Sequence, residues 1–147
     1  MSVLEGKNIL LGVTGSIAAY KSIILLRLLK REGADVQVIF SDSANNFVTQ
    51  LTFSTLSEKK VLTDFFEDDD KVEWVNHVEL AEWADYMIIA PITSSTLSKL
   101  VTGNADNLLV ATYMSTVCDV FFAPAMDLEM YNSCLLYTSD AADEQQR

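Results

Sequence analysis

Cysteine, proline and histidine are scarce in this chain of 147 residues, which has two cysteines, two prolines and one histidine. Two cysteines are too few for a disulfide framework or a multi-cysteine metal cluster, and we expect no metal site. The N-terminus also lacks the basic start and small-residue cleavage site of a signal peptide. These absences predict a cytoplasmic protein.

Long apolar runs and an excess of basic residues are absent too. No run approaches the roughly 20 apolar residues that a membrane helix needs, so we expect no membrane segment. Lysine and arginine total 10 against 21 acidic residues, which gives a formal net charge of -11. A chain this acidic is poorly suited to follow a phosphate backbone, so nucleic acid is not an expected partner.

Short apolar runs alternate with amphipathic segments along the chain. Four runs predict buried strands, at Asn8–Val13, Asp35–Phe40, Tyr86–Ala90 and Asp119–Ala123. We expect Pro91 and Pro124 to end the last two. Alternating strands and helices in a chain of single-domain length predict an α/β fold with an open parallel sheet covered on both faces.

The helices follow from apolar residues spaced three and four apart. One helical face is formed by Ile17, Tyr20, Ile24 and Leu28, and Gly33 is expected to stop that helix. The same spacing predicts helices within segments 77–84, 97–101 and 108–115. A short helix is expected around Asn45 to Leu51, while the acidic run 67–70 is interpreted as a solvated loop.

Small and hydroxyl residues lie at the ends of three of the predicted strands and in the turns that follow, at 12–16, 90–95 and 123–127. Ligands of open parallel sheets bind outside the carboxyl ends of the strands. The first of these turns opens a helix, whose N-terminus favours an anion. The structural alternative is a tight turn capped by Ser16. The G-x-x-G-S pattern is not the dinucleotide fingerprint G-x-G-x-x-G, and Asp42 is poorly placed to bind a ribose.

Several polar side chains have both a functional and a structural interpretation. His77, the only histidine, is a candidate general acid or base, or else an ordinary helix-cap or core residue. Asp127 is a candidate ligand-contacting residue or the N-cap of a following helix. Asp106 and Asn107 have the same structural alternative, since they precede the predicted helix at 108–115.

Three strings together resemble one family, the homo-oligomeric flavin-containing cysteine decarboxylases. They are GVTGSIAAYK, HVELAEWADYMIIAPITSSTLSKLVTGNADNLL and APAMDLEMY. Within that family, the chain is most similar to the decarboxylase domain of bifunctional phosphopantothenoylcysteine decarboxylase/phosphopantothenate–cysteine ligases, over nearly all of residues 1–131. The resemblance implies a flavodoxin-like three-layer sandwich that binds FMN in a homo-oligomer built from trimers. It also implies decarboxylation of 4'-phospho-N-pantothenoylcysteine to 4'-phosphopantetheine in coenzyme A biosynthesis.

The resemblance also assigns roles to individual residues. It implies that FMN is bound by Gly15, Ser16, Ile17, Ser41, Thr93, Ser94, Ser95, Ala105, Asp106 and Asn107. It makes His77 the catalytic histidine, and it places Met126 and Asp127 in a motif that binds the substrate carboxylate. Asp127 stands where the family motif has asparagine, and an ionised Asp127 would repel that carboxylate.

Other functions remain open at this point. The chain could be another flavoenzyme on the same scaffold, such as a peptide-cysteine decarboxylase or, less favoured by His77, a flavin prenyltransferase. It could instead be a non-catalytic flavin-binding regulatory protein. A plain nucleotide-binding module would bind NAD or ATP and would not be yellow.

The last 14 residues, CLLYTSDAADEQQR, differ in character from the rest of the sequence. They resemble the translation of a common transposase sequencing adapter. We therefore expect residues 1–133 to be a flavoprotein domain incomplete at its C-terminus, and residues 134–147 to be non-native. The family's proton-donating cysteine lies beyond such a point, and neither Cys118 nor Cys134 matches it. On this expectation the fragment alone is not a competent decarboxylase.

Overall fold

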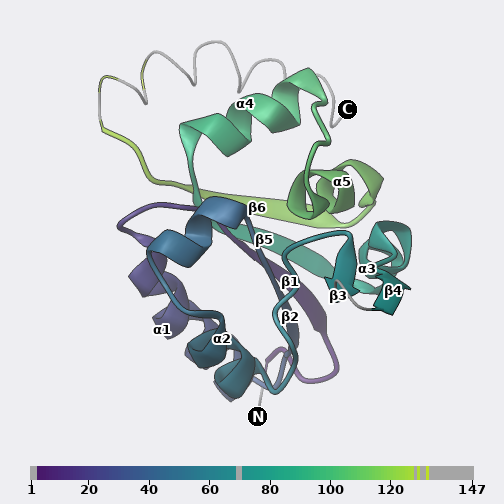
Figure 1. Ribbon diagram of the computed structural model, residues 1–147. Coiled ribbons are helices and arrows are strands. Elements are labelled where there is room, and N and C mark those ends of the chain that lie inside the picture. Colours follow the sequence, from purple (N-terminus) through teal and green to yellow (C-terminus); the bar gives the residue numbers. More distant parts are fainter. Residues whose placement is uncertain (1–2, 69–70, 128, 130–131, 133–147) are drawn as a thin grey trace.

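The computed structural model describes the chain except for residues 1–2, 69–70, 128, 130–131 and 133–147. The elements, shown in Figure 1, are β1 (Asn8–Val13), α1 (Ala19–Arg31), β2 (Asp35–Phe40), η1 (Asp42–Asn46), α2 (Gln50–Ser57), β3 (Phe66–Asp68), β4 (Lys71–Trp74), α3 (His77–Trp83), β5 (Tyr86–Ile92), α4 (Ser94–Thr102), α5 (Leu108–Ser115) and β6 (Asp119–Pro124). Among the described residues, no helix is long and apolar enough to cross a membrane.

The main sheet has the strand order β2-β1-β5-β6, and all of its neighbouring strands are parallel. Counted along the main sheet alone, this is the order 2-1-3-4 with which a flavodoxin-like fold begins. Helices α1 and α2 cover one face, and α3, α4 and α5 lie on the other side (Figure 1). The predicted α/β three-layer arrangement is therefore confirmed.

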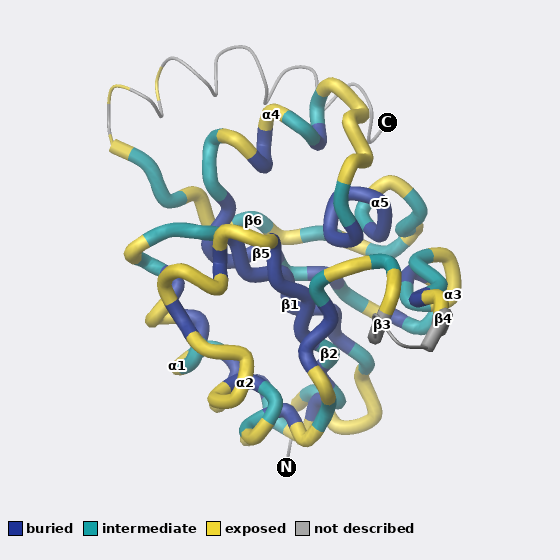
Figure 2. Tube along the Cα trace, in the orientation of Figure 1, coloured by how far each residue is buried: buried dark blue, intermediate teal, exposed yellow. Residues whose placement is uncertain are grey.

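Burial explains why the strands could be recognised. Strands β1 and β2 are buried along nearly their whole length, as Figure 2 shows, because helices cover both faces. Pro124 ends β6 as predicted, whereas β5 runs through Pro91 to Ile92. Strand β6 lies at the edge of the sheet and is more exposed, with Phe121 54% accessible.

The core has two parts, one on each face of the sheet. Beneath α1 and α2, the rings of Phe40 and Phe53 meet edge to face with centroids 5.0 Å apart. Beneath the other helices, Met87 and Ile89 of β5 pack with Leu109 of α5. Burying both faces of the sheet in this way fixes the positions of the strand ends where the loops of interest begin.

Helix α1 buries a different face from the one that its large apolar residues mark. Its buried side chains are Ala19, Ser22, Leu26 and Leu29. The predicted apolar face remains exposed at all four positions, Ile17, Tyr20, Ile24 and Leu28. The small Ala19 and Ser22 let the helix lie close to the sheet, and the Ser22 hydroxyl donates to the Ala90 carbonyl oxygen.

Two expectations for segment 41–70 need correction. The short helix is a 3₁₀ helix at Asp42–Asn46, followed by α2 at Gln50–Ser57, because Thr49 caps α2 by accepting from the Thr52 amide. The acidic run is not wholly a loop, since Phe66–Asp68 pairs antiparallel with Lys71–Trp74. The other two acidic residues of that run, 69 and 70, lie outside the described residues.

The later helices match their predictions. Helix α4 ends at Gly103, which has a φ of +71° and so adopts the left-handed conformation that glycine favours. The predicted segment 108–115 is α5. Helix α3 begins at His77 because the Asn76 side chain accepts from the Val78 and Glu79 amides at 3.0 and 3.2 Å.

Candidate functional site

The turn after β1 packs directly against the loop after β2. At Gly15, an added Cβ would lie 2.6 Å from the Ser43 Cβ and 2.9 Å from the Ser43 carbonyl carbon. Real Cβ atoms do not approach other carbons this closely, so the contact requires glycine. The second loop is tied to the first by its backbone as well, since the Ser41 amide donates to the Val13 carbonyl at 3.0 Å.

Thr14 joins the first turn to the loop after β5. Its buried hydroxyl donates to the Pro91 carbonyl at 2.7 Å and accepts from the Thr93 amide at 3.1 Å. The loops that follow β1, β2 and β5 therefore meet at the carboxyl edge of the sheet. This edge is where parallel α/β sheets bind ligands.

The hydroxyl residues at this edge have defined positions. Ser16 Oγ accepts from the Ala18 amide at 3.2 Å, and Ser41 Oγ lies 3.3 Å from Ser43 Oγ. Thr93 caps α4 by accepting from the Thr96 amide at 3.2 Å. Ser94 and Ser95 occupy the first turn of α4, where Ser94 is half-buried and Ser95 is exposed.

A hollow of about 390 Å³ lies at the N-terminus of α1. Its lining comprises Ser16, Ile17, Ala18, Tyr20, Lys21, Ala125 and Met126. The hollow therefore brings Met126, from the segment after β6, together with predicted residues of the first turn. Because Ala18 at the N-cap has no capping side chain, the positive end of the helix dipole is left for another acceptor.

Lys21 was missed by the sequence analysis. It lines this hollow from the first turn of α1 and adds a positive charge to an anion-favouring helix end. Its place in GSIAAYK, five residues after Ser16, was the available signal. Thr14 was also missed, because a buried threonine in a strand-end turn looks like an ordinary packing residue until its hydrogen-bond partners are known.

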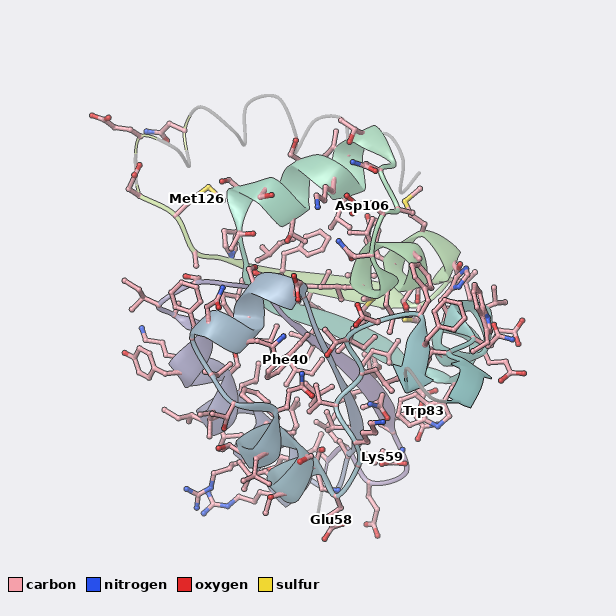
Figure 3. All side chains as sticks on the ribbon, in the orientation of Figure 1. Phe40, Glu58, Lys59, Trp83, Asp106 and Met126 are labelled. Carbon is pink, nitrogen blue, oxygen red and sulfur yellow. The ribbon has the colours of Figure 1, made fainter. Side chains whose placement is uncertain are left out.

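The segment 105–107 lies apart from this hollow. Figure 3 shows Asp106 and Met126 near opposite ends of α4. Asp106 forms an ion pair with Lys99 at 3.2 Å and accepts from Asn107 Nδ2 at 3.1 Å. Asn107 caps α5 by accepting from the Val110 amide at 2.9 Å, which confirms its structural interpretation. Ala105 is exposed.

His77 also lies away from the hollow, at the start of α3 on the side where the β3–β4 hairpin lies (Figure 1). Asn76, rather than His77, is the helix cap. The His77 ring is half-buried and contacts the rings of Phe65 and Trp74, with centroids 5.9 and 6.4 Å away. Its Nδ1 is enclosed and has no hydrogen-bond partner in the described part of the chain.

Two further predictions concern the end of the chain. Asp127 is exposed, and the helix that it was expected to cap falls on residues 128 and 130–131, which lie outside the described residues. Cys118 is half-buried just before β6, with its sulfur 3.4 Å from Thr116 Oγ1. Its position at the amino end of a strand separates it from the carboxyl edge.

Comparisons with known proteins agree with this arrangement. The model of the family described as Flavoprotein matches residues 2–138. The chain is 41% identical over 130 residues to the coenzyme A biosynthesis bifunctional protein CoaBC of Bacillus subtilis strain 168, covering 88% of this chain and 32% of that protein. For CoaBC of Haemophilus influenzae the identity is 39% over 132 residues, covering 90% and 33%. The chain thus spans about a third of the length of the curated relatives it matches.

Solved structures share the fold. The FMN-dependent cysteine decarboxylase SpaF superposes with a TM-score of 0.86 at 25% identity, covering 97% of this chain and 82% of that one. A mutant PPC decarboxylase complexed with pantothenoylaminoethenethiol gives a TM-score of 0.76 at 30% identity, covering 94% and 78%. The predicted flavodoxin-like fold is confirmed by these matches.

Proposed function

Because this chain belongs to the Flavoprotein family, we propose that it is the FMN-binding domain of a phosphopantothenoylcysteine decarboxylase, a carbon–carbon lyase. The proposed reaction converts 4'-phospho-N-pantothenoylcysteine to 4'-phosphopantetheine in cytoplasmic coenzyme A biosynthesis. Two similarities support it, to CoaBC at 41% identity and to a PPC decarboxylase at 30% identity. The observation that carries it is the meeting of three strand-end loops around Thr14 and Gly15.

The residues at this edge fit a flavin phosphate. The contact between Gly15 and Ser43 brings backbone close to the site, and the uncapped N-terminus of α1 attracts an anion. We propose that Ser16, Ile17 and Lys21 hold the phosphate group. Hydroxyl groups of the other loops then contact the rest of FMN, from Ser41, Thr93, Ser94 and Ser95.

On the basis of the family resemblance, we propose that segment 105–107 belongs to the FMN site. Its side chains are already engaged, Asp106 with Lys99 and Asn107 with the Val110 amide. We therefore propose that Ala105, Asp106 and Asn107 contribute their main chain rather than their side chains. This assignment predicts that Asn107 variants lose stability of α5 before they lose FMN affinity.

The protein residues bind and orient, and FMN, when bound, supplies the redox chemistry that makes loss of carbon dioxide from a cysteinyl group easy. His77 lies away from the hollow that Met126 lines, so we propose that it meets the substrate at a contact between subunits of the homo-oligomer, where it holds or transfers a proton. Met126 offers an apolar contact at the hollow, and Asp127 lies beside it in sequence where the substrate carboxylate is expected. Asp127 can lie next to that carboxylate without repelling it only when a proton or a cation lies between the two groups.

We further propose that residues 1–133 are the native part of this domain and that residues 134–147 are not native. The family match runs through residue 138, so it includes 134–138, and segment 139–147 lies outside it. Genomic sequence across the junction of Ser133 and Cys134 tests the proposal. A coding sequence that departs from CLLYTSDAADEQQR after Ser133 is expected, and an identical genomic sequence would refute it.

We also propose a homo-oligomer built from trimers. Exposed apolar side chains on α1 and just before it support self-association, since Ile24 and Ile17 are 57% and 79% accessible. In light scattering, the unmodified protein is expected to exceed the mass of a monomer, and Ile24→Lys is expected to reduce it. A monomeric unmodified protein would contradict the proposal.

A chimera provides the functional test. It joins residues 1–133 to the remaining residues of the Bacillus subtilis relative, and is called the chimera below. We expect it to copurify with FMN and to release carbon dioxide from phosphopantothenoylcysteine. His77→Asn should keep FMN but lower turnover by about a hundredfold or more, the usual contribution of a general acid or base. A yellow but inactive chimera would instead support a flavin-binding regulatory role.

A further inference from the structure

Three aromatic rings around His77 form a connected cluster, which we call the aromatic triad of Phe65, Trp74 and His77. Phe65 and Trp74 stack with centroids 5.7 Å apart and planes 21° from parallel. Phe65 meets His77 edge to face at 5.9 Å and 81°, and Trp74 lies 6.4 Å from His77 at 60°. All three distances fall within the range in which aromatic rings attract each other.

The backbone fixes where these rings begin. The Val75 amide donates to the Phe65 carbonyl at 2.6 Å, which ties the start of the hairpin to its end. Val75 is buried in the core, and Phe65 packs against the same cluster. Asn76 is the N-cap of α3 and His77 is the first residue of that helix, so the backbone fixes where the His77 side chain begins. The triad is therefore joined to the core rather than suspended on a mobile loop.

The hydrogen-bond pattern of His77 shows what orients its ring. A functional imidazole is commonly held by a hydrogen bond at one nitrogen, which leaves the other for chemistry. Here Nδ1 is enclosed and has no such partner among the residues that the structure describes. The aromatic neighbours of the ring are Phe65 and Trp74, and we infer that their packing takes the place of the hydrogen bond.

We propose that Phe65 and Trp74 are positioning residues for His77, holding its imidazole plane so that Nε2 faces the substrate. This inference rests on the proposed function for the identity of the substrate. The geometry of the triad is independent of it. Phe65 supplies the edge-to-face contact, and Trp74 stacks on Phe65 and also lies beside the His77 ring. Trp74 is 56% exposed, so its substitution leaves most of the core intact.

Phe66 is the matched control. It is adjacent to Phe65, is 52% exposed and contacts Trp74 with centroids 5.5 Å apart. No ring contact joins Phe66 to His77 among the described residues. Phe66→Leu therefore makes the same chemical change as Phe65→Leu without removing a neighbour of the imidazole.

The first test uses the full 147-residue chain, in which His77 gives the only histidine signal. Nuclear magnetic resonance measures the order parameter of the His77 ring. We expect Phe65→Leu and Trp74→Leu each to lower it, and Phe66→Leu to leave it unchanged. An unchanged order parameter in folded Phe65→Leu and Trp74→Leu variants would overturn the proposal.

The second test uses the chimera. Phe65→Leu is expected to lower kcat about tenfold to a hundredfold, as misplacement of a catalytic group does, with KM and FMN content unchanged. Phe65→Tyr, which keeps the ring, should restore kcat. A parent chimera without turnover would refute the proposed reaction while the order parameters still decide the positioning claim. Equal kcat for Phe65→Leu and Phe66→Leu would refute the catalytic consequence.

Discussion

Replacing Gly15 with alanine tests the contact on which the strand-end site depends. The new methyl carbon would lie 2.6 Å from the Ser43 Cβ and 2.9 Å from its carbonyl carbon, where ordinary contacts begin near 3.4 Å. The Ser43 side chain can turn aside, but its backbone carbon cannot. One of the two loops must therefore move, and the backbone that faces the proposed FMN phosphate moves with it.

The expected cost follows from this geometry. Overpacking of this kind lowers the free energy of unfolding by about 1 to 3 kcal/mol. Alanine also reduces the conformational entropy of the unfolded chain, which raises the free energy of unfolding by about 0.4 to 1 kcal/mol. A net loss of about 1 to 2 kcal/mol lowers Tm by about 2 to 8 °C in a chain of this size. Misaligning one charge-assisted hydrogen bond weakens FMN binding by about tenfold or more.

Thermal unfolding and fluorescence titration with FMN measure the two effects separately. Gly12→Ala is the matched control, because its methyl group would meet the Leu109 side chain at 2.6 Å in the core rather than the loop that contains Ser43. It should lower Tm but leave FMN affinity unchanged. Ser43→Gly added to Gly15→Ala should restore part of the affinity. Full FMN affinity in Gly15→Ala would refute the role assigned to this contact.

Three further predictions concern single side chains. Thr14→Val removes the hydroxyl that links Pro91 to Thr93, so urea unfolding should show a loss of about 1 to 3 kcal/mol, whereas Thr14→Ser should lose less. Lys21→Gln should weaken FMN binding several-fold at low salt and less at high salt, as a titration at two ionic strengths would show. Asp127→Asn should lower the KM of the chimera for the substrate at unchanged FMN content, because it removes a charge like that of the substrate carboxylate. An unchanged or higher KM would contradict this reasoning.

The central part of the sheet could be predicted from the sequence because strands such as β1 and β2 are buried on both faces. Asn8–Val13 is apolar after its first residue, and Asp35–Phe40 is mostly apolar, with Gln37 in its interior. The hairpin was missed for the opposite reason, since the acidic run 67–70 dominates the local composition. The large apolar side chains of this hairpin are single aromatic residues such as Trp74, which stacks on Phe65 rather than on a neighbour in sequence.

Helix α1 shows how periodicity can identify an element but not its buried face. The spacing of Ile17, Tyr20, Ile24 and Leu28 correctly predicted a helix, yet those side chains are exposed. Small residues, Ala19 and Ser22, face the sheet instead. The distance between the helix and the sheet decides which face of α1 is buried, and the local sequence does not determine that distance.

The sequence indicated which residue types lie at the candidate site better than it indicated how those residues are arranged. Hydroxyl residues at strand ends were recognisable, since parallel strands share one carboxyl edge. The contact of Gly15 with Ser43 joins positions 28 residues apart and depends on the register of β1 beside β2. The triad around His77 depends in the same way on the pairing of a hairpin that the sequence did not reveal.

The central claim is that this chain provides the FMN-binding site of a phosphopantothenoylcysteine decarboxylase. The most direct measurement combines the visible absorbance of the purified chimera with mass spectrometry of its product. We expect a yellow protein that releases carbon dioxide and forms 4'-phosphopantetheine from 4'-phospho-N-pantothenoylcysteine. A colourless protein, or a yellow one that leaves this substrate unchanged, would contradict it.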